Sequence, residues 1–128
     1  LGPGERPSGH GCLDLGEEEY TRGRPHPMID PLPRAELIVE AARDPRLAVL
    51  LLDVVLGHAS HSDPAGALVP AIEAARAARP ELVTVAHVVG TESDPQVASR
   101  QEATLRDAGV LLAPTNAAAA RLAAAMVG

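Results

Sequence analysis

Two almost wholly apolar runs, at residues 47–55 and 82–89, are the feature that most restricts the fold of this chain. Runs of this kind are typical of strands that are covered on both faces, as in the middle of a parallel sheet. Between them lies a segment with the spacing of a helix, at residues 64–79. Parallel neighbours need such a crossover, and these crossovers are right-handed. The sequence therefore predicts an α/β domain with a mainly parallel sheet.

The rest of the chain continues the alternation of strands and helices. Further strands are expected at residues 12–16 and 110–113, and further helices at residues 33–43, 95–107 and 115–126. The order βαβαβαβα predicts a small doubly wound fold of the flavodoxin-like type, with helices on both faces. Asp63 and Asp94, each followed by proline, are predicted to be helix N-caps. In such folds ligands sit outside the carboxyl ends of the strands.

The first eleven residues differ in composition from the remainder of the chain. Residues 1–11 have the glycine and proline content of a linker, and we expect a flexible linker there. A chain of 128 residues is long enough for one core and leaves little room for a second. The predicted organisation is therefore a linker at residues 1–11 and one domain at residues 12–128.

Composition excludes several classes of function. The net charge is −6 without a basic cluster, and Tyr20 is the only aromatic residue, so nucleic-acid binding is not expected. The eleven basic residues are all arginine, which excludes a Schiff-base lysine or a P-loop lysine in this chain. Cys12 stands alone, so neither a disulfide nor a thiolate metal site is expected, and a cytoplasmic setting fits. No apolar run reaches the roughly 20 residues that span a bilayer.

A proline-rich segment carries the densest polar chemistry. The prolines at positions 25, 27 and 31 exclude a helix or a central strand, so Arg22, Arg24 and His26 are expected on a loop. Two arginines and a histidine so close together can bind a carboxylate, a phosphate or an acyl phosphate. The glutamates at residues 17–19 could instead neutralise the arginines, and residue type alone leaves both interpretations open.

Polar residues also lie at the ends of the two apolar strands. Asp53 could act as a general base, but hydrogen bonds to neighbouring loop amides are the preferred interpretation. Thr91 and Glu92 add to this polar edge, in a loop that looks like a phosphate loop. The predicted Asp94 cap would occupy the free amides of that loop, and Glu92 would repel an anion. We therefore do not expect phosphate there.

The start of the last predicted helix offers a better site for an anion. Thr115 and Asn116 are neutral capping residues, so the positive end of the helix dipole remains usable. Among the predicted helix starts, this one is the preferred anion site.

The histidines do not predict a metal site. His58, His61 and Asp63 have the pattern H-x-x-H-x-D, and imidazole with carboxylate can hold zinc. Asp63 is better explained as a helix N-cap, and two loop histidines leave the ligand set incomplete. His87 falls inside a predicted strand, where a buried neutral histidine bonded to the backbone is expected.

Several motifs together resemble one protein family. They are the segment at residues 13–31, LLLDVVLG at 50–57, DPAG at 63–66, GTESDPQ at 90–96 and DAGV at 107–110. These motifs resemble the carboxy-terminal domain of FdrA-like proteins, relatives of the succinyl-CoA synthetases, over residues 13–127. The resemblance implies the fold of the ligase-CoA domain in the succinyl-CoA synthetase alpha subunit.

The resemblance also implies a function. The chain is expected to be the carboxy-terminal domain of a larger acyl-CoA synthetase, or of an acyl- or carbamoyl-transferring enzyme, and to be inactive in isolation. In the succinyl-CoA synthetases a histidine carries phosphate in the loop that should correspond to residues 90–96, and this chain has no histidine there. A non-catalytic assembly or dimerisation module is the alternative. The expected contribution to an enzyme is an anion pocket, which would include Arg22, Arg24, His26, Thr115 and Asn116.

Cofactors and partners follow from the same resemblance. No cofactor is expected in this domain, whereas CoA and a nucleotide could serve the full-length protein. The expected partners are an upstream CoA-binding domain of the same protein, other enzyme subunits and further copies in a homo-oligomer. Neither nucleic acid nor a membrane is expected as a partner.

Overall fold

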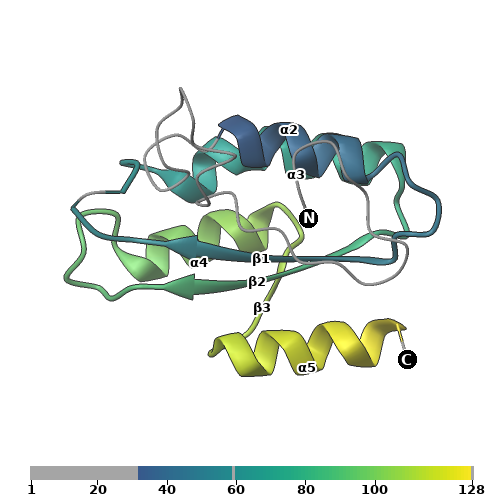
Figure 1. The fold of residues 1–128 in the computed structure, drawn as a ribbon. Helices are drawn as coiled ribbons and strands as arrows, with labels where there is room; N and C mark the ends of the chain where they lie inside the picture. The colour runs from purple at the N-terminus through teal and green to yellow at the C-terminus, as the bar shows by residue number, and fades with distance from the viewer. Residues whose placement is uncertain (1–31, 59, 128) are drawn as a thin grey trace, which may run out of the picture.

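A parallel sheet with helices on both faces forms the core of the protein (Figure 1). The computed structural model describes residues 32–58 and 60–127. In this part, no helix is both long enough and apolar enough to cross a membrane. The three strands pair in the order β1-β2-β3, all in parallel. The elements are α2 (Leu32–Ala41), β1 (Val49–Val55), α3 (Pro64–Ala78), β2 (Val83–Val89), α4 (Ala98–Asp107), β3 (Leu111–Leu112) and α5 (Asn116–Val127).

Separate apolar clusters hold helices to the two faces of the sheet. On one face, Ile38 of α2, Leu68 of α3 and Leu105 of α4 are buried in one cluster. On the other face, Ala119 of α5 is buried together with Val85 of β2. Figure 1 shows the same division, with α2 and α3 above the sheet and α5 below it. The predicted α/β class with a doubly wound, parallel sheet is confirmed.

The central strand of this sheet is β2, which pairs with β1 on one side and with β3 on the other. Val85 and Ala86 are both fully buried, Val85 in the cluster beside α5 and Ala86 in the cluster beside α3 and α4. Successive side chains of a strand point to opposite faces of the sheet. A strand buried on both faces needs apolar residues at nearly every position, which explains the run at residues 82–89.

Most element boundaries agree with the prediction within two residues, but α4 begins at Ala98 rather than at residue 95. The predicted Asp94 cap is wrong, because its Oδ2 atom accepts from the Thr91 N–H at 2.7 Å inside the loop. Val97 takes the N-cap position with a φ of 58° and no side-chain hydrogen bond. That backbone conformation is unusual for a β-branched residue. The predicted linker and the strand at residues 12–16 lie outside the described residues.

Replacing Thr84 by valine should stabilise the protein. Thr84 of β2 is 3% exposed, and its Oγ1 atom has no hydrogen-bond partner in the described part of the chain. Valine has the same shape without the desolvated hydroxyl, so the free energy of unfolding should rise by about 1 kcal/mol. The matched control is Thr115→Val, which removes the acceptor of the Ala118 N–H and should lower that free energy by about 1 kcal/mol. Urea denaturation of both variants tests this, and a Thr84→Val variant of equal or lower stability would contradict it.

Candidate functional site

The carboxyl ends of the strands carry three loops, and a buried glutamine joins the first two of them. Gln96, 6% exposed, lies in the loop after β2. Its Nε2 atom donates to the Gly57 carbonyl at 2.8 Å and to the His61 carbonyl at 2.9 Å. Its Oε1 atom accepts from the Gly57 N–H at 3.1 Å. One side-chain amide therefore fixes the loop after β1 to the loop after β2.

A second buried glutamine closes the start of α3. Gln101 of α4 is 4% exposed, and its Oε1 atom accepts from the Ala65 N–H at 2.8 Å. Its Nε2 atom donates to Oδ1 of Asp63 at 2.9 Å. The same Asp63 oxygen accepts from the Gly66 N–H at 3.0 Å, which confirms Asp63 as the N-cap. Because these amides already have acceptors and a carboxylate lies among them, the start of α3 does not offer an anion site.

The start of α4 is closed by Glu92. Oε1 of Glu92 accepts from the Ser99 N–H at 2.8 Å, and Oε2 accepts from the Ser99 hydroxyl at 2.9 Å. The Ala98 N–H donates to the Thr91 carbonyl at 3.1 Å. The amides at the start of α4 are thus occupied by Glu92 and Thr91, and the Asp94 carboxylate occupies the Thr91 N–H inside the loop. Thr91 and Glu92 of the predicted polar edge both hold the loop against the helix.

The start of α5 remains accessible. The Thr115 hydroxyl accepts from the Ala118 N–H at 3.0 Å, so Thr115 is the neutral cap that the sequence predicted. Thr115, Asn116 and Ala117 are exposed. In the described part of the chain, the N–H groups of Asn116 and Ala117 have no hydrogen-bond partner. Of the helices that follow the described strands, α5 is the one whose first turn offers free donors at the positive end of its dipole.

A row of polar groups crosses the sheet near this edge. Arg34 of α2 donates from Nη2 to the Asp53 carbonyl at 2.6 Å and lies 3.5 Å from Oδ1 of Asp53. Asp53 pairs in register with His87 on the neighbouring strand. His87 is half-buried, and its Nδ1 atom lies 3.2 Å from the Ala113 carbonyl. A carbonyl oxygen only accepts, so Nδ1 carries the proton. The row ends two residues before Thr115.

Asp53 makes a different contact from the one expected. We expected its carboxylate to bond to loop amides, but its contact within the described residues is with Arg34. Burial lowers the pKa of the Arg34 guanidinium, and the nearby Asp53 charge opposes that change. The sequence interpretation missed Arg34, because a single arginine in the first turn of a predicted helix carries no motif. The only available signal was its position directly after the proline-rich segment.

The loop histidines do not form a metal site with other described residues. His61 uses Nδ1 to accept from the Asp63 N–H at 3.0 Å, and His58 is exposed. In the part of the chain that the structure describes, no group of three or more His, Cys, Asp or Glu side chains could hold a metal ion. Arg22, Arg24 and His26 lie outside the described residues, so their role as an anion-binding group stays a prediction.

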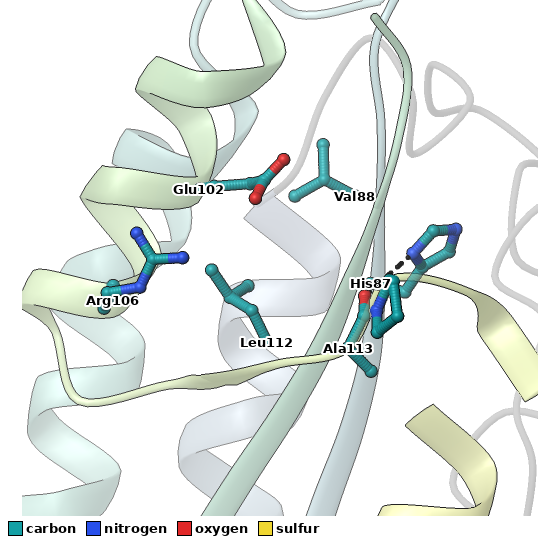
Figure 2. Close-up of a pocket in the computed structure, with 7 residues that line it drawn as sticks. His87, Val88, Glu102, Arg106, Leu112 and Ala113 are labelled. Carbon is teal, nitrogen blue, oxygen red and sulfur yellow. Dashed lines mark hydrogen bonds between the residues drawn. The ribbon is translucent and has the colours of Figure 1, made fainter. Parts of the chain in front are cut away.

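A cavity of about 250 Å³ lies between α4 and the strands β2 and β3, and His87 and Ala113 of the polar row are among its lining residues (Figure 2). Glu102 and Arg106 of α4 point into it beside Val88 and Leu112. The imidazole of His87 points away from both charged side chains. Of the predicted anion-site residues that the structure describes, Thr115 and Asn116, neither lines the cavity.

Replacing Gln101 by leucine should destabilise the protein, because the buried Ala65 N–H then loses its acceptor. The free energy of unfolding should fall by about 2 kcal/mol, the cost of leaving a buried donor unpaired. Arg100→Leu, at the exposed neighbouring position on α4, is the control and should change it by less than about 0.5 kcal/mol. Chemical denaturation compares the two variants. Equal effects would show that the Gln101 hydrogen bonds do not hold the loops together.

Comparison with known proteins places the chain in a family. A family model described as CoA-ligase matches residues 5–126. YahF of Escherichia coli (strain K12), described as an uncharacterized protein, is 43% identical over 111 residues, which cover 84% of this chain and 22% of YahF. The chain therefore spans about a fifth of the length of that relative. Since the family model matches nearly the whole sequence, this chain belongs to the CoA-ligase family.

Proposed function

We propose that this chain is the ligase-type domain of a larger FdrA-like enzyme, either an acyl-CoA synthetase or an acyl- or carbamoyl-transferring enzyme, and that it contributes an anion pocket. The observation that carries this proposal concerns the first-turn N–H groups of the helices. Those of α5 are accessible, whereas those of α3 and α4 already have acceptors. Free N–H groups at the positive end of a helix are a general binding site for carboxylates and phosphates. Membership of the CoA-ligase family supports chemistry on such groups.

The pocket would combine a helix start with charged side chains. Thr115 and Asn116 provide neutral polar groups and backbone donors for an acyl phosphate or a carboxylate. Arg22, Arg24 and His26 would neutralise the charge of that anion, since guanidinium groups bind carboxylate and phosphate oxygens in pairs. The chain itself has no lysine and no nucleotide-binding loop. We therefore assign activation of the acyl group to other parts of the protein, and expect the isolated domain to be inactive.

A phosphohistidine is not part of the proposed mechanism. The loop at residues 90–96 contains no histidine. The Glu92 carboxylate bonds to both the N–H and the hydroxyl of Ser99, at the start of α4. The negative charge of Glu92 would repel a phosphoryl group at the start of α4, so we do not place phosphate transfer in this loop.

The proposal extends to cofactors, partners and location. CoA and a nucleotide would bind to an upstream CoA-binding domain and to other subunits, with this domain supplying the anion pocket between them. The relative, which is about four times as long as this chain, has room for such domains. We further propose that the protein forms a homo-oligomer. We also propose a cytoplasmic location, with which a single cysteine in the sequence agrees.

The alternative is a non-catalytic module that assembles domains or subunits. Partly exposed apolar side chains favour it, because Leu51, Val89 and Leu111 are 44%, 43% and 40% exposed on three strands of one sheet. Exposed apolar patches often mark interfaces between proteins. A crystal of the complete protein separates the two functions. An ordered anion at the start of α5 supports the pocket, and a large apolar two-fold contact without an anion supports the module.

Replacing Asn116 by aspartate should separate anion binding from folding. A negative charge in the first turn of α5 complements the helix dipole, so the free energy of unfolding should stay equal or rise by up to about 0.5 kcal/mol. The same charge repels an anionic substrate, and KM in the complete enzyme should rise about fivefold to tenfold. Asn116→Ala, which removes the side chain without adding charge, is the control and should change KM less. An unchanged KM for Asn116→Asp would contradict a role of the α5 start in the anion pocket.

Replacing Arg24 by alanine tests the proline-rich segment. If Arg24 stabilises a developing anion, the variant of the complete enzyme should lose about 2–4 kcal/mol of transition-state stabilisation. Its free energy of unfolding should then change by less than about 1 kcal/mol. If the glutamates at residues 17–19 hold Arg24 instead, the melting temperature falls while turnover stays nearly normal. Steady-state kinetics and thermal denaturation of the same variant distinguish these results, and normal turnover would contradict the functional role.

A further inference from the structure

Arg34 reaches from α2 to the outer side of β1. At the ends of the β1–β2 ladder, the Val83 N–H donates to the Ala48 carbonyl and the Leu56 N–H donates to the Val89 carbonyl. Backbone groups of a strand alternate in direction, so the even-numbered residues of β1 face β2 and the odd-numbered ones face away. Asp53 therefore turns its carbonyl to the outer side of the strand. Arg34 binds this carbonyl at 2.6 Å.

The guanidinium of Arg34 is largely buried but only partly satisfied. Its side chain is 20% exposed. A guanidinium has five N–H donors, and in the described part of the chain only Nη2 of Arg34 has an acceptor. Nε and Nη1 have no partner there. Buried arginines are normally paired and hydrogen-bonded, because an unsatisfied buried charge is costly.

Asp53 does not balance this charge. Its Oδ1 atom lies 3.5 Å from Nη2, at the long end of hydrogen-bonding distance, and its side chain is 62% exposed. Burial is the larger influence on the pKa of Arg34 and lowers it, and the Asp53 charge only opposes this effect. Within the described residues, the site therefore holds a largely buried cation whose ion-pair partner, Asp53, is mostly exposed to water. A further negative group would complete its coordination.

We propose that Arg34 is a binding residue for a small oxyanion, a carboxylate or a phosphoryl group, and that the Asp53 carbonyl orients its guanidinium. The donors that Asp53 leaves free would bind the oxygens of the ligand. This inference deepens the proposed function, since it adds a described arginine to the anion pocket. Arg34 begins the polar row that runs through Asp53 and His87 toward Thr115, although α2 and α5 cover opposite faces of the sheet.

A purely structural role gives a different expectation. Arg34 covers an outward carbonyl of β1, and charged side chains commonly protect the edges of sheets. In that role the guanidinium would need no ligand, and anions in solution would leave it unchanged. The two roles therefore differ in a property that is measured directly at Arg34.

The test is an NMR titration of the arginine Nε–H signals in the 128-residue chain, with inorganic phosphate and separately with acetate. We expect a saturable shift of the Arg34 signal. Arg79 is the internal control, because its Nε already donates to Glu81 at 3.0 Å, and its signal should move little. Asp53→Asn keeps the carbonyl contact but removes the competing charge, so it should tighten anion binding about threefold or more. Arg34→Lys keeps the charge but loses the planar group of donors and should weaken binding about tenfold.

Each outcome has one meaning. Saturation by both anions supports a general oxyanion site, and saturation by one of them identifies the ligand as a carboxylate or a phosphoryl group. No saturable shift of Arg34 in either the wild-type chain or Asp53→Asn overturns the proposal, as does an equal shift of Arg79. If Arg34→Lys fails to fold, the Asp53→Asn titration alone decides. The titration measures binding and needs no turnover. A negative titration would therefore contradict the role of Arg34 alone, whereas the kinetic tests in the complete enzyme address the proposed function.

Discussion

The parallel pairing of β1 with β2 is the constraint on which the rest of the structure depends. Seven residue pairs fix the register, and both strands therefore end at the same edge of the sheet. The loops that follow them come close enough for Gln96 to bond to Gly57 and His61. The register also places Asp53 beside His87. A slip by one residue would turn these side chains to the other face and expose the apolar ones.

The helix starts at this edge differ in whether a carboxylate of the chain already accepts from their backbone amides. Carboxylates of Asp63 and Glu92 accept from the Gly66 and Ser99 amides in the first turns of α3 and α4, which stabilises both helices and disfavours anion binding there. The start of α5 has a hydroxyl cap from Thr115, and among the described residues no carboxylate accepts from its first amides. The proposal of an anion site at the start of α5 rests on this difference between the helix starts.

Arg34 and the start of α5 give the edge two positive features, joined by the polar row through Asp53 and His87. In the proposed function these features bind the anionic form of an acyl group, which is in keeping with the match to a family model described as CoA-ligase. The chain spans about a fifth of its relative YahF. Activation of the acyl group would then belong to other parts of the protein, and this domain would supply binding and orientation.

The sequence by itself determined the strands, helices and helix caps that depend on residues near one another in the chain. Apolar runs predicted β1 and β2, helical spacing predicted the helices between them, and local capping identified Asp63 and Thr115. Tertiary structure decided the contacts between distant residues. Gln101 bonds to Ala65, 36 positions away in the sequence, and Arg34 bonds to Asp53, 19 positions away. At the start of α4, Glu92 bonds to Ser99, seven positions away, where the sequence had predicted a cap from Asp94. No periodicity encodes such pairs, because they form only when the register of the sheet brings separate loops and helices together.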